Sequence, residues 1–487
     1  MDTTDLHDRL SRLAERTAPP AADARAVVRG LVARRRAQRR QRLGVGAAVV
    51  AVAAVVGVVP AVLGDDHPPT TATGLGTEPP AADVVSPDTR GSLAGDAAFV
   101  DGIRQLSWAD RSTVSVAYDV ADPDHLPDPP VGTRRVVFAG DVAGERWALV
   151  VGENTAHPQP PSHDPQEQAD PAASSHVAAA WFTGPAGAAP AQMVMASLPQ
   201  GIDTTRPLAL ADEGTGGLVV VSAPGDTIEL SLRPEVAVDG TVSRSWQAVD
   251  APDGVAVADL SGDLPGSKAT LRFRVVRDGS VVLTAPPASR GRPRATPPVE
   301  VGRLRPPPAP APGDAEPARQ VETALNFRLG LSGDQVTATV LWAGDIPAPS
   351  DRRARLSLVA VTVPSGAVYL SSSYEWGLVS DKGAGGDCGD GLAAAGTPLD
   401  QRTTVLHCDP GESSDGGGLS TLVVVAPAAA VTARALDRGG AVLSEFPMTD
   451  GALVAPFPAG TATVDTLAAD GSLLSHTAPL TRAALGD

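Results

Sequence analysis

The chain has 487 residues, enough for two or three domains, and 43% of them are hydrophobic although only 3% are aromatic. Its formal net charge is −17 at pH 7, and only Lys268 and Lys382 among its 39 basic residues are lysines. The net negative charge lies after residue 42, and a part this acidic repels nucleic acid and anionic lipid and would favour cations or basic partners, so we expect no nucleic-acid partner. Solubility is the favoured explanation of this charge.

Residues 1–42 form an N-terminal tail that is rich in arginine. The tail has 11 arginines and 5 acidic residues, whereas the rest of the chain has 28 basic and 51 acidic residues. Leu6, Leu10 and Leu13 follow the spacing of one helix face, and a second apolar stripe begins after Asp23, so we expect two short helices. So short a segment buries too little surface to be stable alone. We expect it to dock on a cytoplasmic protein or to lie on lipid headgroups.

Residues 43–63, LGVGAAVVAVAAVVGVVPAVL, contain no charged or strongly polar side chain. A helix of this length is about 31 Å long and matches a hydrocarbon core of about 30 Å, so we predict a transmembrane helix in contact with membrane lipid. The basic flank before it predicts a cytoplasmic N-terminus and an extracytoplasmic C-terminal part at the cell membrane. This membrane flank consists of Arg34, Arg35, Arg36, Arg39, Arg40 and Arg42.

The alternative for this segment is an export signal that is cleaved. Arg39 and Arg40 give it some twin-arginine character. The apolar run is, however, longer than the roughly 7–15 residues of a usual signal sequence, and no A-x-A cleavage site follows it. We therefore expect the span to be retained.

The N-terminal layout resembles that of actinobacterial single-pass membrane proteins related in layout to membrane anti-sigma factors. The resemblance covers residues 1–65 and rests on DLHDRLSRLAERTAPPAADARAVVRGLVARRRAQRRQR followed by the Val/Ala-rich span. It implies that the tail binds a cytoplasmic regulator such as a sigma factor. The zinc-binding signature of such factors, a His followed by a Cys-x-x-C pair, is absent from the tail.

Residues 64–98 are rich in Pro, Thr, Asp and Gly, and they are predicted to form a disordered stalk. Beyond them, five blocks recur in the same order, which indicates two diverged copies of one fold. The blocks align 114–127 with 336–349, 134–151 with 355–372 (Trp147 with Tyr369), Trp181 with Trp376, 216–230 with 420–434, and 272–282 with 463–474.

The apolar runs within each copy are short and rich in β-branched residues, and Gly-containing turn signals separate them. Asp278-Gly279 and Asp470-Gly471 are typical of hairpins. We therefore predict a mainly β protein, with one transmembrane helix and two homologous extracytoplasmic antiparallel β-sandwich-like domains. The first domain covers residues 99–287, a Pro-rich linker covers 288–319, and the second domain covers 320–487.

Cys388 and Cys408 are the only cysteines, and both follow the predicted span. In an oxidising compartment two cysteines in one domain indicate a disulfide. The alternative is a zinc site, because His407 adjoins Cys408, but two further ligands at a usable spacing are missing. The disulfide is favoured.

No catalytic motif is found, and we predict no catalytic residue, no cofactor and no metal site. His157, His163 and His176 share a Pro-rich tract with several carboxylates and could bind Zn²⁺ or Cu²⁺, but a solvated loop is favoured. Carboxylates near the cysteines could bind Ca²⁺, but turn formation is favoured; they are Asp381, Asp387, Asp390 and Asp415. Carbohydrate stacking is open for three tryptophans, Trp108, Trp246 and Trp342, whereas core packing is expected for Trp147, Trp181 and Trp376.

These features predict a membrane-anchored extracytoplasmic protein that binds a ligand or protein and has no enzymatic activity. The main alternative is a transmembrane signalling regulator of the anti-sigma type, whose tail, residues 1–42, binds a cytoplasmic partner. The third hypothesis is an extracytoplasmic hydrolase, but the sequence contains no known hydrolase motif.

Overall fold

The computed structural model describes residues 82–108, 126–155, 175–263, 267–294, 298–305, 316–348, 352–376, 384–410 and 419–481, together with 483 and 485. The N-terminal tail, the predicted span at 43–63 and its arginine flank lie outside these residues. The described chain is mainly β and contains several antiparallel sheets, as predicted. None of its helices is long and apolar enough to cross a bilayer.

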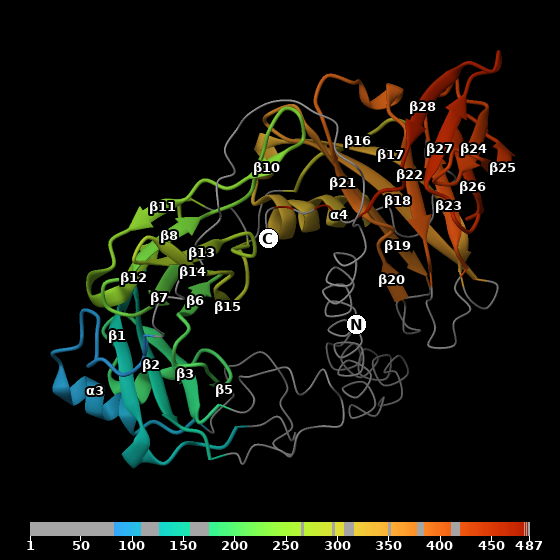
Figure 1. The fold of residues 1–487 in the computed structure, drawn as a ribbon. Helices are drawn as coiled ribbons and strands as arrows, with labels where there is room; N and C mark the ends of the chain where they lie inside the picture. Colours follow the sequence, from blue (N-terminus) through green and yellow to red (C-terminus); the bar gives the residue numbers. More distant parts are fainter. Residues whose placement is uncertain are drawn as a thin grey trace, which may run out of the picture. The chain divides into compact units, whose positions relative to one another are not determined.

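Residues 82–290 build one helix and three layered sheets, which we call the first stack (Figure 1). Its elements are α3 (Ala97–Arg104), β1 (Arg135–Val142), β2 (Glu145–Glu153), β3 (Val177–Pro185), β4 (Val194–Met195), β5 (Gln200–Gly201), β6 (Leu208–Asp212), β7 (Gly217–Val221), β8 (Thr227–Ser231), β9 (Glu235–Val236), β10 (Val242–Ser243), β11 (Gln247–Val249), β12 (Val255–Asp259), β13 (Arg272–Arg277), β14 (Ser280–Ala285) and β15 (Ala288–Arg290). The first sheet has the order β1-β2-β3-β4, with β5 beside β3. The second sheet is β12-β7-β6-β15 and the third is β11-β8-β13-β14, while β9 and β10 form a separate hairpin.

Each pair of neighbouring layers in the first stack shares a hydrophobic core. Phe99 and Ile103 of α3 pack on one face of the first sheet, and Trp147 on the other face packs against the second sheet. A third core lies between the second and third sheets and includes Val220. Because the second sheet is buried on both faces, β7 is the unbroken apolar run GLVVV rather than an alternating strand. The stack therefore has one sheet more than the predicted sandwich.

Residues 298–485 build a second stack. Its elements are β16 (Val301–Arg303), α4 (Glu316–Ala324), the π-helical turn η5 (Leu325–Leu329), β17 (Thr337–Ala348), β18 (Arg352–Thr362), β19 (Val368–Trp376), β20 (Ala384–Gly386), β21 (Asp390–Ala393), β22 (Thr404–Cys408), β23 (Thr421–Val425), β24 (Thr432–Leu436), β25 (Val442–Pro447), β26 (Ala452–Pro456), β27 (Thr463–Leu467) and β28 (Leu473–Thr477). Short 3₁₀ turns in the two stacks are η1 (Val131–Thr133), η3 (Pro190–Gln192), η4 (Pro252–Gly254), η6 (Gly333–Gln335) and η7 (Leu399–Gln401). The sheets have the orders β16-β17-β18-β19-β20 (with β21 also beside β19), β22-β23-β26 and β25-β24-β27-β28. Three cores again join the helix to the first sheet, the first sheet to the second, and the second to the third.

The third sheets of the two stacks agree in strand order and in register. Arg274 on β13 faces Glu229 on β8, and Asp465 on β27 faces Arg434 on β24. One residue further along β13 and β27, the pairing with β14 and β28 is interrupted by a β-bulge in both sheets. Bulges at matching positions are structural features of a fold rather than random irregularities.

Two residue matches within the repeated blocks are wrong. Trp147 on β2 faces the second sheet, whereas Tyr369 on β19 faces the helix layer. The two strands do not correspond, because β19 pairs with both β20 and β21 as β3 pairs with both β4 and β5. The counterpart of β2 is β18, and the pairs β1-β2 and β17-β18 are each interrupted by one bulge.

Trp181 and Trp376 do lie on corresponding strands, β3 and β19, but at different positions along them. The first residue after the bulge in β1, Phe138, is connected across β2 to Trp181. Its counterpart in β17, Trp342, is connected across β18 to Ser372 and not to Trp376.

The predicted stalk, residues 64–98, is wrong over its last part. Val84 and Val85 are buried in the core between the first and second sheets. The Arg90 guanidinium is buried and donates hydrogen bonds to the carbonyls of Val84, Ser222 and Asp253, at 2.6, 2.6 and 3.0 Å. The overall composition of the segment, rich in Pro and Asp, predicts disorder. A few of its residues nevertheless anchor it to the first stack.

The start and the middle of the predicted linker, residues 288–319, contribute strands β15 and β16, and its last residues belong to α4. β15 pairs in parallel with β6, and β16 pairs in parallel with β17, so the sheets are not purely antiparallel. An extended segment can pair with the open edge of a sheet, and proline is tolerated there because one side of an edge strand needs no N–H donor. The predicted linker thus forms an edge strand in a sheet of each stack and is not a separate spacer between them.

Candidate functional site

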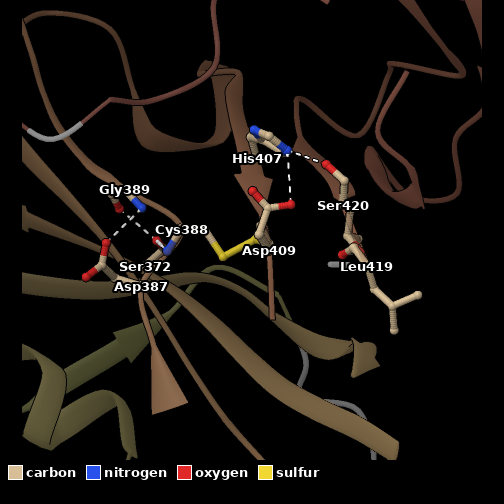
Figure 2. Close-up of a disulfide and its surroundings, with 10 residues drawn as sticks. Ser372, Asp387, Cys388, Gly389, His407, Asp409, Leu419 and Ser420 are labelled. Atoms are coloured by element: carbon tan, nitrogen blue, oxygen red, sulfur yellow. Dashed lines mark hydrogen bonds and ion pairs between the residues drawn. A yellow bond between two sulfur atoms is a disulfide. The ribbon is translucent and has the colours of Figure 1, made fainter. Parts of the chain in front are cut away.

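The predicted cysteine pair is the centre of the candidate site. Cys388 precedes β21 and Cys408 ends β22, and the two form a disulfide with a Cα–Cα distance of 4.6 Å (Figure 2). Ser372 on β19 holds the Cys388 loop, because its hydroxyl accepts from the Cys388 N–H at 2.9 Å and donates to the Gly389 carbonyl at 2.7 Å. Both sulfurs are buried and bonded to each other, so neither is a thiolate ligand for the zinc alternative.

His407 lies beside the disulfide and contacts two oxygen-bearing side chains. Its Nε2 is hydrogen-bonded to the Ser420 hydroxyl and lies 3.3 Å from Asp409 Oδ1 (Figure 2). The ring stacks on Phe457 with a centroid distance of 3.7 Å. In a hydrolytic triad the carboxylate binds Nδ1 and leaves Nε2 to the serine. Here Ser420 and Asp409 share one nitrogen, so this arrangement is not that of a triad, although all three residue types are together.

The acidic residues around the cysteines have separate structural roles. Asp387 accepts from the Gly389 N–H at 3.2 Å, as the turn interpretation predicts. Asp390 accepts from the Tyr369 hydroxyl at 2.7 Å and lies 3.0 Å from the Arg328 guanidinium. Burial first, and the Asp390 charge second, raise the pKa of the Tyr369 hydroxyl far above its usual value. These carboxylates therefore do not converge on a calcium site.

Within the described ranges no group of three or more His, Cys, Asp or Glu side chains is arranged to hold a metal ion. Several residues that the sequence considers for metal binding lie outside these ranges: His157, His163, Asp381 and Asp415.

The tryptophans whose side chains the structure describes differ in how deeply they are buried. Trp108, Trp147 and Trp181 belong to the cores of the first stack, so Trp108 is not available for sugar stacking. Trp342 is partly buried and packs against the core of the second stack. Trp246 is half-buried on the third sheet, where the Arg274 guanidinium lies 4.6 Å from its ring centroid. One face of this indole is therefore already used by a cation–π contact.

An ionic network that the sequence does not reveal lies in the first stack. Arg290 on β15 contacts Asp212 at 2.8 Å, donates to the Thr183 hydroxyl at 2.7 Å and binds Glu145. Its guanidinium also lies 5.2 Å from the centroid of the Trp147 ring. Since Glu145 and Thr183 belong to the first sheet and Asp212 to the second, Arg290 links the two sheets.

The Arg290 network and the disulfide occupy matching places. Leu210 on β6 and Leu406 on β22 pair with equivalent valines, Val219 and Val423, in the two second sheets. Two residues after these leucines stand Asp212 and Cys408. The first and second sheets are therefore linked by an ion network in the first stack and by a covalent bond in the second.

A second pair of charged residues that the sequence does not reveal is Glu213 and Lys268, both of which are buried. Glu213 accepts from the Lys268 main-chain N–H at 2.6 Å and from the Ser267 hydroxyl at 3.4 Å. Burial raises the pKa of the Glu213 carboxyl, against the effect of these hydrogen bonds, and burial lowers the pKa of the Lys268 amine. The only feature of the sequence that could have drawn attention to this pair is that lysine is rare in the chain, where Lys268 is one of two.

The raised pKa of Glu213 predicts a pH-dependent effect of Glu213→Gln. A carboxyl whose pKa is raised by folding contributes stability below its unfolded pKa, and this contribution is lost as the pH rises through the folded pKa. Glutamine cannot ionise, so the free energy of unfolding of the variant should rise relative to the wild type as the pH increases above the ordinary glutamate pKa of about 4.3. Urea unfolding at a series of pH values measures the difference. The exposed Glu322→Gln is the control, and an equal slope for both variants would contradict the prediction.

No family model matches the chain, and no curated protein resembles it at a significant level.

Proposed function

We propose that this is a membrane-anchored envelope protein whose two stacks bind a partner outside the cytoplasm. The disulfide is the observation that carries the proposal. It uses both cysteines of the chain, and disulfides persist in oxidising compartments but are rare in the cytosol. Together with the apolar segment 43–63 and its arginine flank, it favours a cytoplasmic tail and an extracytoplasmic C-terminal part.

The same proposal treats the two stacks as diverged copies of one domain. The matching sheet orders and the matching bulges support this duplication. So does a pair of opposite charges at the same register position of the third sheets, with opposite polarity: Glu229 faces Arg274, and Arg434 faces Asp465. Glu229 and Arg274 form an ion pair, whereas Arg434 binds Glu445 and Asp465 binds His476. A charge pair can reverse during divergence while its attraction is kept. Duplicated, rigid β units suit a protein that presents loops to a partner.

The reversed order of these facing charges predicts the outcome of a charge swap in the first stack. Glu229→Arg alone places two arginines opposite each other and should lower the free energy of unfolding by about 1 kcal/mol. Adding Arg274→Asp, which copies the polarity of the second stack, should restore most of this loss. Urea unfolding of both variants and of Arg274→Asp alone gives the coupling energy. Purely additive effects would count against equivalence of the two pairs.

The localisation is tested by adding protease to intact cells that express the full chain with a tag at each end. We expect the C-terminal tag to be lost and a fragment with the N-terminal tag to be protected. Thiol labelling of the exported protein should require prior reduction, since both cysteines are paired. Full protection of the C-terminal tag, or recovery of the chain in the soluble fraction, would refute the proposal.

Binding is tested by crosslinking on the same intact cells with a reagent that does not cross membranes. The proposal expects a crosslinked species that contains the full chain and an envelope component. A chain with the correct topology that forms no adduct would remove the binding function but not the localisation.

A further inference from the structure

A polar groove lies at the third sheet of the first stack, beside β8 and β11. The turn after β12 lines one part of it, and Ser332 and Gln335 of the second stack line another. Its volume is about 570 Å³, within the range of roughly 300–1,000 Å³ that small-molecule sites occupy. The candidate site described above contributes no residue to it.

The lining of the groove combines an apolar part with neutral and charged hydrogen-bonding groups. Leu230 and Leu232 supply the apolar part, and Gln247 contributes an amide from the edge strand β11. Asp263 contributes a carboxylate and Ser332 a hydroxyl. Amides and hydroxyls both donate and accept, and carboxylates accept, so together they suit a ligand whose own groups do both.

The wall formed by the second stack is held firmly. Gly330 has φ +62°, and a Cβ at this position would lie 2.5 Å from Thr270 Oγ1 and 2.8 Å from Arg233 Cβ. The Arg233 guanidinium also donates to the Gly330 carbonyl at 3.4 Å. Only glycine allows so close an approach, and the groove is therefore formed before a ligand arrives. Preformed sites lose less entropy on binding.

From this lining we propose that the groove binds a neutral, hydroxyl-rich ligand, namely a short oligosaccharide. Ring hydroxyls pair with the amides, the serine hydroxyls and the Asp263 carboxylate, and the C–H face of a sugar ring covers the partly buried Leu232. Arg233 in the same lining works against a cationic ligand, and Glu235 and Asp263 work against an anionic one. The inference rests on the proposed extracytoplasmic binding function and names its ligand class.

The test uses the purified full-length protein in detergent micelles on an array of neutral oligosaccharides, acidic oligosaccharides and oligolysine. We expect retention of neutral oligosaccharides. Gln247→Ala and Asp263→Ala, both at exposed positions, should each weaken this binding about tenfold, the effect of one lost hydrogen bond to a polar ligand. The matched controls are Gln401→Ala and Asp400→Ala, an exposed pair on the second stack, which should bind as the wild type does.

Three results would overturn the inference: no oligosaccharide retained, equal retention by groove and control variants, or retention of oligolysine or acidic sugars alone. Leu232→Trp, which fills part of the groove, gives an independent check and should abolish retention while urea unfolding confirms that the variant is folded. The protease test on intact cells does not depend on a ligand. Correct topology without sugar binding would therefore remove this inference and leave the localisation standing.

Discussion

Replacing both cysteines, Cys388→Ser with Cys408→Ser, should lower the free energy of unfolding of the second stack by about 3 kcal/mol. The bond closes a loop over a sequence separation of 20 residues, and for such a loop the chain-entropy model gives a stabilisation of about 3 kcal/mol. The loss should be confined to the second stack, because both cysteines belong to its core. Pulse proteolysis of the full chain in urea, read out by fragments of each stack, measures the two transitions separately.

Reducing agent supplies the control for the cysteine variant. The reduced wild type should unfold at the same urea concentration as the double serine variant, and the variant itself should not respond to reduction. Ser372 still holds the Cys388 loop after the bond is lost, so we expect the native fold to persist without denaturant. A wild type that is equally stable with and without reductant would contradict the prediction.

Arg290→Met should destabilise the first stack by about 3 kcal/mol and leave the second stack unchanged. The substitution keeps an unbranched apolar stem against Trp147 but leaves Glu145 and Asp212 without their cation. Removing one partner of a largely buried ion pair costs roughly 3–5 kcal/mol because the remaining charge stays desolvated. We take the lower end, since Glu145 is only partly buried. The same pulse proteolysis detects the shift.

A triple variant separates the loss of the cation from a loss of packing. Adding Asp212→Asn and Glu145→Gln to Arg290→Met removes the two stranded charges and should recover most of the stability. Arg292→Met, an exposed arginine two residues further along, is the matched control and should have almost no effect. If the triple variant is as unstable as the single one, the network does not act through charge.

The sequence predicts the β character because its signals are local. GLVVV and TLVVV are short β-branched runs, and both form fully buried strands, β7 and β23. The Asp278-Gly279 signal also forms its hairpin: both residues have positive φ, and they join β13 to β14. The disulfide is predictable for a different reason, since a chain with two cysteines leaves a single possible pairing.

The layering is not predictable in the same way. A buried run such as LVVV shows that both faces of a strand are covered, but it does not show what covers them. A third sheet in each stack supplies the cover, and its strands come from later in the chain. Strand matching fails for a related reason: the recurring blocks align β2 with β19, whereas the strand pairing matches β19 with β3, so Trp147 and Tyr369 lie on strands that do not correspond.

The candidate sites show the same division. Cys388 and Cys408 could be paired from their number, but the place of Asp212 opposite Arg290 could not, because Arg290 stands in a Pro/Arg-rich segment typical of a linker. His407, Asp409 and Ser420 are close in sequence. Only the tertiary structure shows that the Ser420 hydroxyl and the Asp409 carboxylate both contact Nε2 of His407.

The amino-acid sequence by itself determined that this protein is mainly β, that its two cysteines pair, and that similar blocks recur along the chain, because each of these depends on neighbouring residues or on a count. Only the tertiary structure decided that three sheets stack beneath a helix, which partner each buried charge meets, and where a groove opens, because these depend on residues brought together from distant parts of the chain.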